Sequence, residues 1–232
     1  MRAIFFKTIA FVLILISSGC ASVRNEKDTP YVVVVSLDAF RWDYDSIYST
    51  PVINDIAGNG VMAERLIPSF PTKTFPNHYS IATGLYPDHH GLVNNSFYAP
   101  DLDLVYRIGD RTMVENGAFY GGEPFWVTAH KAGIVTASFY WVGSEAPIGG
   151  IQPDHWKTFD DEVAFGDRVD TVLKWLSLPA PRRPHLVTLY FEEPDAISHT
   201  YGPVSPETRG MVESLDSLIG VLRVGIKNLP HA

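Results

Sequence analysis

The chain has 232 residues, of which 46% are hydrophobic and 19% are charged, and this composition is usual for a folded globular protein. It is long enough for one domain with a substantial core or for two small domains. The net charge of −8 and the pI near 5.4 argue against a general nucleic-acid-binding surface. They do not exclude a small anionic substrate, because a bound metal ion can supply positive charge locally.

The N-terminal residues MRAIFFKTIAFVLILISSGC indicate a targeting segment. Arg2 and Lys7 precede an apolar run over residues 9–16, far shorter than the roughly 20 residues that cross a bilayer. We therefore expect residues 1–20 to be a removable signal peptide. Cys20, the only cysteine, follows small residues as in a bacterial lipoprotein signal. We expect it to be lipidated, which would anchor an exported protein in the envelope; a plain cleaved signal with release into the periplasm is the alternative.

The next residues alternate between strand and helix patterns. Residues 21–30 are polar and predict a short tether. The run YVVVVSLD from Tyr31 is apolar at most positions and predicts a strand buried on both faces of a parallel sheet; HLVTLYFEEPD from His185 has the same design. A third strand is predicted over residues 134–141. Helices are predicted over residues 49–61, 78–87, 121–133, 162–179 and 205–228.

Start and stop signals support these helices. The first predicted helix stops at Gly58 or Gly60, and the third stops at Gly133. The last one begins at a serine cap, Ser205. Alternating strands and helices predict an α/β fold, in which ligands bind beyond the carboxyl ends of the strands.

Two acidic residues lie at such strand ends. Asp38 follows the first predicted strand and is either a turn-forming residue or a site residue. Asp195 and His199 form a D-x-x-x-H pattern, which on a helical turn places a carboxylate and an imidazole on one side. These groups suit zinc or a similar divalent ion, although the pattern alone more often marks an exposed pair.

The segment SFPTKTFPNHYSIATGLYPDHHGLVNN contains the remaining candidates. Thr74 lies between two prolines, just before the expected helix, and is either an activated nucleophile or an ordinary N-cap. His89 and His90 are adjacent in a turn, and we interpret them as structural or surface residues. Asn95 lies in a chance match to the glycosylation pattern and is free to serve another purpose.

Taken in order, several of these strings resemble one family. VVVVSLDAFRWDY, PSFPTKTFPNHYSIATGLYPDHHGLVNN, GGEPFWVTAHKAG, YWVGSEAPIGGIQP and LYFEEPDAISHTYGP are similar to the nucleotide pyrophosphatase/phosphodiesterase family of the alkaline phosphatase superfamily. The resemblance runs from about Tyr31 to the C-terminus. It implies an alkaline-phosphatase-like α/β fold, with a mostly parallel central sheet and helices on both faces, and a small phosphodiester substrate, expected to be a nucleotide.

The resemblance also implies roles for the candidate residues. Two Zn²⁺ ions would lie at the strand ends, one bound by Asp38 and Thr74 and the other by Asp195 and His199. Thr74 would attack phosphorus and form a covalent threonine intermediate, and Asn95 would donate to a non-bridging phosphate oxygen.

Substrate contacts are implied at three aromatic residues. Phe75 would flank the substrate, and Trp156 or Phe159 would stack on a base.

The family pattern is not complete in this sequence. A later S-D-H-G-M-like motif and a further histidine, which supply three metal ligands, are missing, and His231 is not in a matching context. Residues 31–232 are therefore interpreted as the N-terminal part of a phosphodiesterase catalytic domain, with a sheet incomplete at the C-terminus. We expect this chain to be a truncated and inactive fragment.

Two alternative functions stay open. One is a lipid-headgroup phosphodiesterase or a phosphonate hydrolase of the same superfamily. The other is a non-catalytic remnant at the cell envelope. The oligomeric state is not predicted by any feature of the sequence.

Overall fold

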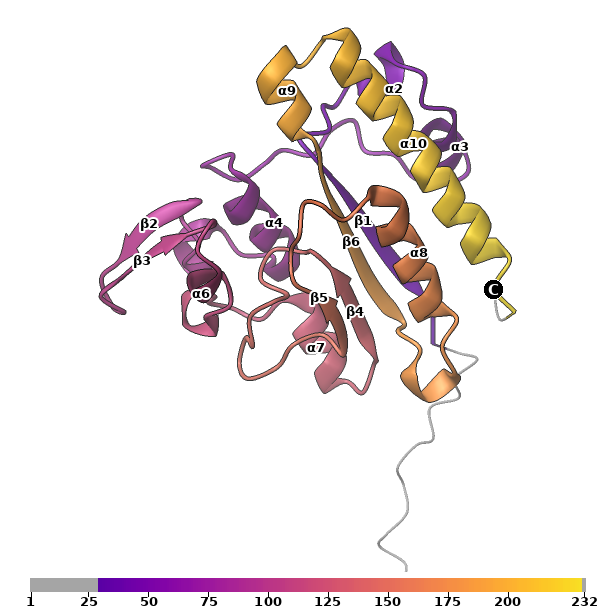
Figure 1. Ribbon diagram of the computed structural model, residues 1–232. Coiled ribbons are helices and arrows are strands. Elements are labelled where there is room, and N and C mark those ends of the chain that lie inside the picture. The colour runs from indigo at the N-terminus through magenta and orange to yellow at the C-terminus, as the bar shows by residue number, and fades with distance from the viewer. Residues whose placement is uncertain (1–28, 231–232) are drawn as a thin grey trace, which may run out of the picture. The chain divides into compact units, whose positions relative to one another are not determined.

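A four-stranded parallel sheet organises the unit that begins at Tyr31, in a computed structural model that describes residues 29–230 (Figure 1). The sheet order is β1-β6-β4-β5, with β1 at Val32–Asp38, β6 at Leu186–Pro194, β4 at Thr136–Phe139 and β5 at His155–Lys157. Because every pair is parallel, the four carboxyl ends lie at the same edge. The mostly parallel α/β sheet is confirmed.

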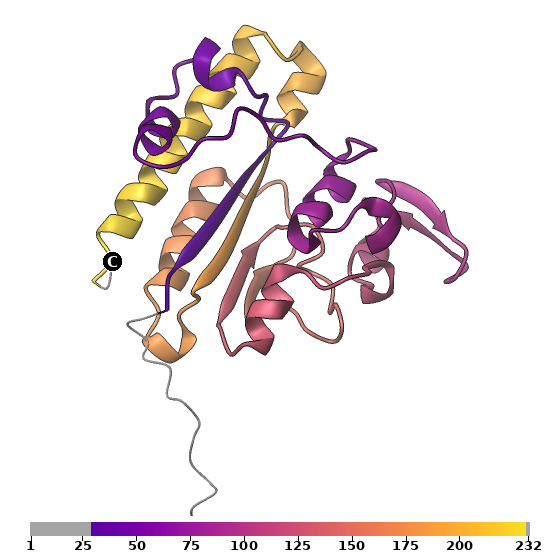
Figure 2. The same ribbon diagram turned by 180° about the vertical axis from the view of Figure 1, so that it is seen from behind.

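Helices cover both faces of this sheet, as expected (Figures 1 and 2). On one face α8 (Phe165–Leu176) and α10 (Pro206–Lys227) pack over β6, and on the other α7 (Phe125–Lys131) packs over β4, with α4 (Thr74–Thr83) beside α7. Alternate residues along each strand therefore enter different hydrophobic clusters. The α8/α10 cluster takes Val33, Val35, Leu37, Val187, Leu189 and Phe191, and the α4/α7 cluster takes Val34 and Leu186.

The position of β1 differs from the expectation of a strand buried on both faces. It is the outer strand of the described sheet, its residues from Val33 onward are half-buried, and Val32 is 46% exposed. An unbroken apolar run cannot distinguish a central strand from an outer one.

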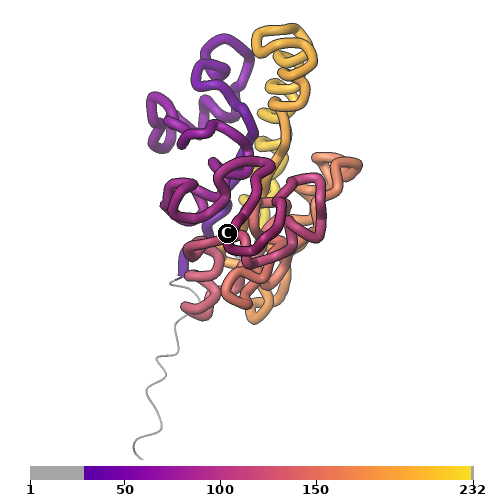
Figure 3. Tube along the Cα trace, turned by 90° about the vertical axis from the view of Figure 1, so that its left-hand side faces the viewer, coloured from indigo at the N-terminus to yellow at the C-terminus, as the bar shows by residue number. Residues whose placement is uncertain are grey.

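Shorter elements complete the unit. β2 (Ser96–Ala99) and β3 (Leu104–Arg107) form an antiparallel hairpin beside the main sheet. Short helical segments lie at α2 (Tyr44–Ile47), α3 (Pro51–Gly58), α5 (Pro87–His90), α6 (Arg111–Val114), α9 (Asp195–Tyr201), Gly117–Phe119 and Ala180–Arg182. Both α3 and α9 pack on α10, so early and late segments of the chain lie side by side (Figure 3).

The boundaries of α4 correct the sequence prediction. The helix begins at Thr74, four residues before the expected start at His78, and ends at Thr83 because Gly84 adopts a left-handed conformation with φ of 70°. Pro76 is compatible with the first turn, where backbone N–H groups have no acceptor within the helix. The predicted cap of α10 is confirmed, since Ser205 Oγ accepts a hydrogen bond from the Thr208 N–H at 3.1 Å.

The targeting features lie outside the described residues. These are the signal peptide over residues 1–20, Cys20 and most of the expected tether. Within residues 29–230, no helix combines the length and the apolar character that a membrane crossing requires.

Candidate active site

Asp38 reaches the carboxyl edge through an irregularity in the β1–β6 pairing. Leu37 pairs with Phe191, but Asp38 pairs with Pro194, so β6 contributes extra residues at this point. The shift brings Asp38 next to the start of α9. Ala39 then turns the chain with φ of 55°, a left-handed conformation that costs a non-glycine residue roughly 1–2 kcal/mol. Strained turns of this kind cluster at functional sites.

One oxygen of Asp38 joins three elements. Oδ2 accepts a hydrogen bond from Thr74 Oγ1 of α4 at 3.0 Å and another from the Tyr190 hydroxyl of β6 at 2.7 Å. Burial, together with the negative charge of Asp38, raises the pKa of Tyr190, so this hydroxyl stays protonated and donates. The Thr74 hydroxyl is therefore aimed at a carboxylate that is itself fixed in place.

The backbone of Thr74 is held by a buried histidine. The Thr74 carbonyl accepts from His78 Nδ1 at 2.8 Å, and His78 Nε2 lies 2.9 Å from Ser36 Oγ of β1. Because a carbonyl can only accept, Nδ1 carries a proton. In the neutral imidazole, Ser36 then donates to Nε2. His78 thus ties the first turn of α4 to β1.

Asn95 lies beside the same turn. Its Oδ1 accepts a hydrogen bond from the Phe75 N–H at 3.2 Å. This bond fixes the orientation of the amide and leaves the Nδ2 hydrogens available to a ligand. The intervening α5 is anchored by His90, which is fully buried and has Nε2 2.9 Å from Ser80 Oγ, whereas His89 is exposed.

Asp195 and His199 share one side of α9, as their spacing predicted. The distance from His199 Nε2 to Asp195 Oδ1 is 3.5 Å, and the His199 side chain is 79% exposed. Burial raises the pKa of Asp195, and the negative charge of Asp38 raises it further; His199 and Lys73 act in the opposite direction. The charge of Asp38 therefore disfavours the ionised form of Asp195.

This electrostatic conflict suits a divalent cation, which would neutralise both carboxylates. The side chains present are of the types that zinc binds. Between residues 29 and 230, however, no three His, Cys, Asp or Glu side chains form a group that could hold an ion. The side chains at this site are chemically suitable zinc ligands, but there are fewer of them than a catalytic zinc site normally has.

The aromatic candidates lie in two places. Phe75 is next to Thr74 and packs partly against the α4/α7 cluster. Trp156 is in β5, at the opposite edge of the sheet from β1, and Phe159 follows the end of β5. The Phe159 ring packs 5.1 Å from the ring of Tyr140, another residue with a positive φ, of 70°.

Two residues in the site were missed by the sequence analysis. Tyr190 lies within an apolar strand run, and His78 within an expected helix. His78 offered a signal, because it is four residues after Thr74 and so shares its helix face, whereas Tyr190, a hydroxyl within an apolar run, offered none.

Comparison with known proteins identifies similar sequences. A family model described as type I phosphodiesterase / nucleotide pyrophosphatase matches residues 32–230. Human ectonucleotide pyrophosphatase/phosphodiesterase family member 1 is 42% identical over 221 residues, covering 92% of this chain and 24% of the human protein. Venom phosphodiesterase CdcPDE of Crotalus durissus collilineatus is 40% identical over 215 residues, covering 91% of this chain and 26% of its own.

Solved structures are similar as well. Murine ectonucleotide pyrophosphatase/phosphodiesterase 5, as an inactive threonine-to-alanine variant in complex with AMP, matches with a TM-score of 0.80 and 32% identity. The match covers 85% of this chain and 52% of the murine one. The chain thus spans about a quarter of the curated relatives and about half of the solved ones.

Replacing Tyr190 with Phe should destabilise the fold, because it removes a buried donor to a carboxylate. We expect the free energy of unfolding to fall by about 1.5–3 kcal/mol, the usual contribution of a hydrogen bond to a charged group. Urea denaturation followed by circular dichroism measures this change. Tyr86→Phe is the control, since Tyr86 is 70% exposed. A loss no greater than that of the control would contradict the role given to the Tyr190 hydroxyl.

Proposed function

The chain belongs to the type I phosphodiesterase / nucleotide pyrophosphatase family, and we propose that it provides the nucleophile of a zinc-dependent hydrolase acting on phosphodiester and pyrophosphate bonds of nucleotides. The 3.0 Å hydrogen bond from Thr74 Oγ1 to Asp38 Oδ2 is the observation that carries this proposal. Thr74 is also the first residue of α4, where the helix dipole favours an incoming phosphate.

In the proposed reaction, Thr74 Oγ1 bonds to phosphorus as the bond from phosphorus to the leaving oxygen breaks. The hydroxyl proton moves toward Asp38 Oδ2, its present acceptor. The Nδ2 group of Asn95 donates to a non-bridging oxygen, which stabilises charge without requiring a second charge on the substrate. Water then hydrolyses the threonine phosphodiester and restores the hydroxyl.

Metal ions complete the proposal. Asp38 and Thr74 would hold one zinc ion, and Asp195 and His199 the other. Two bound zinc ions supply positive charge for the attacking and leaving oxygens. The described residues would provide two protein ligands for each ion, whereas a catalytic zinc site usually has three.

The expected substrate is a nucleotide rather than a lipid headgroup diester. The murine relative was solved in complex with AMP. Phe75 lies beside the nucleophile, and Phe159 lies past the end of β5, where a base bound beyond the phosphate could stack.

We also propose that the protein is exported and anchored in the bacterial envelope through Cys20. The support is the sequence of residues 1–20, with its two basic residues, short apolar run and small residues before the cysteine.

Thr74→Ala in the full-length protein should abolish diester hydrolysis and leave zinc binding largely intact. Turnover of nitrophenyl thymidine monophosphate and metal content by mass spectrometry are measured together, with nitrophenyl phosphocholine as the headgroup-type comparison. Thr72→Ala is the matched control, since Thr72 is an exposed threonine of the preceding loop. A tenfold loss is only about 1.4 kcal/mol, so retention of more than about a tenth of kcat would contradict the nucleophile role.

Asn95→Ala should lower kcat/KM by a factor on the order of 10² to 10³, mainly through kcat, as for the loss of one oxyanion donor. Steady-state kinetics on the thymidine substrate provide the measurement. Asn59→Ala, at the exposed end of α3, serves as the control. An unchanged rate would remove Asn95 from the site.

Cys20→Ala should move the protein from the membrane fraction to the soluble fraction and remove palmitate labelling. Fractionation of cells that express each form, followed by immunoblotting, tests this. If the unmodified protein is found in the soluble fraction to the same extent as Cys20→Ala, the result favours a plain cleaved signal.

A further inference from the structure

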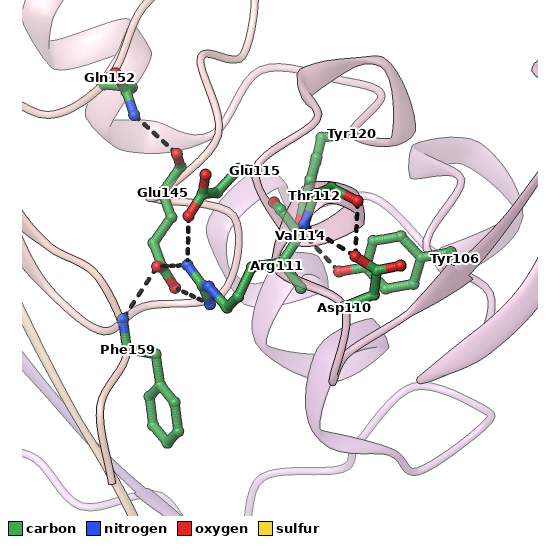
Figure 4. Close-up of polar contacts among 10 residues, drawn as sticks. All are labelled: Tyr106, Asp110, Arg111, Thr112, Val114, Glu115, Tyr120, Glu145, Gln152 and Phe159. Carbon is green, nitrogen blue, oxygen red and sulfur yellow. Dashed lines mark hydrogen bonds and ion pairs between the residues drawn. The ribbon is translucent and has the colours of Figure 1, made fainter. Parts of the chain in front are cut away.

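Glu145 is a buried carboxylate outside the Asp38–Thr74 site, in the turn that follows β4 (Figure 4). Its side chain is only 7% exposed and forms a two-pronged ion pair with Arg111, the first residue of α6. Arg111 Nη1 donates to Oε1 at 3.3 Å, and Nη2 donates to Oε2. A buried carboxylate needs partners of this kind, because its desolvation is costly.

The same carboxylate holds the backbone of the loop after β5. Glu145 Oε2 accepts a hydrogen bond from the Phe159 N–H at 3.0 Å (Figure 4). The Glu145 carbonyl accepts from Gln152 Nε2 at 2.8 Å, which fixes the turn itself. Glu145 therefore connects α6, the turn after β4 and the loop after β5.

Phe159 lies in an exposed stretch, residues 157–162. Its ring packs against Tyr140, and 36% of the residue is exposed. The hydrogen bond to Glu145 is thus a specific backbone restraint on an aromatic side chain that remains partly open to solvent.

The loop that contains Phe159 also lies at the carboxyl edge of the sheet, the same edge as Asp38. Phe159 is two residues past the carboxyl end of β5, and Asp38 is at the carboxyl end of β1, three strand positions away in the sheet order. At about 4.8 Å per strand, this places the two ends of the row roughly 14 Å apart. A substrate that reacted at Thr74 and extended along this row would bring its non-reacting part toward Phe159.

We infer that Glu145, held by Arg111, is a positioning residue that fixes Phe159 as the platform for the base of the substrate, an inference that rests on the function proposed above. Glu145 acts through Phe159, because both of its oxygens are already engaged and its side chain is almost fully covered. Arg111 contributes by compensating the negative charge of the buried Glu145 carboxylate.

The test compares two diesters in the full-length protein: nitrophenyl thymidine monophosphate, which carries a base, and bis(nitrophenyl) phosphate, which does not. Glu145→Gln and Arg111→Met should each raise KM for the thymidine substrate about 5- to 10-fold, within the range for loss of one base-stacking contact. Its kcat, and both constants for the base-free diester, should change less than about twofold. Arg111→Lys should restore part of the loss, because it keeps the charge without the two-pronged geometry.

Glu213→Gln is the matched control. Glu213 also pairs with an arginine, Arg209 at 2.8 Å, and also accepts a backbone N–H, from Ser49 at 3.2 Å, but on the exposed side of α10. Its variant should behave as the unmodified protein on both substrates.

A double-variant cycle separates positioning from a general structural role. In a Phe159→Ala background, adding Glu145→Gln should cause no further rise in KM, because the platform is already gone. Additive effects, equal losses on both diesters, or an unchanged KM for Phe159→Ala alone would each overturn the inference. Circular dichroism monitors folding. If Glu145→Gln does not fold, Arg111→Lys takes its place in the cycle with Phe159→Ala.

Calorimetric titration with AMP gives a second readout that does not need turnover. Glu145→Gln should weaken AMP binding by the same factor as it raises KM. If the unmodified protein hydrolyses neither diester, the proposed reaction fails, and the AMP titration still decides the positioning inference. Equal AMP affinity with and without the Glu145 carboxylate would overturn it.

Discussion

The candidate site depends on a single carboxylate oxygen shared by two hydroxyl groups. Asp38 Oδ2 accepts from Thr74 and from Tyr190, and these three residues belong to α4, β1 and β6. A half-buried charge is stable there because two donors compensate for the water that it has lost. The position of the Thr74 hydroxyl is therefore a property of the whole sheet edge. His78 adds a second restraint, a hydrogen bond from its Nδ1 to the backbone carbonyl of Thr74.

Parallel strands also explain why the remaining candidates gather on one side. The pairing irregularity after Leu37 sets Asp38 beside Asp195, and their mutual repulsion favours a cation. At the other end of the row, Glu145 and Arg111 hold the loop of Phe159. The edge thus carries the two facing carboxylates near β1 and β6 and the partly exposed Phe159 near β5.

The sequence predicted the long elements well, because their patterns extend over many residues. Runs of Val and Leu marked β1 and β6, and Ser205 marked the start of α10. It missed β5, which has three residues, and the β2–β3 hairpin, whose strands have four each, since such short segments contain no readable period. Thr74 and Asp38 were singled out by their positions beside predicted elements, and the family resemblance implied their roles. Tyr190 was not, because a hydroxyl in an apolar strand has no distinguishing motif, and its partner is known only once β1 and β6 are paired.

The pairing of β1 with β6 has a consequence for biosynthesis. Val32 faces Leu186, 154 positions later in the chain. At about 5–20 residues per second, the ribosome takes roughly 8–30 s to produce the partner of a strand that has already emerged. During that interval the apolar run Val32–Leu37 lacks the strand with which it pairs in the folded unit. The Asp38 carboxylate cannot meet Tyr190 before residue 190 exists, so the candidate site is among the last parts of this unit to form.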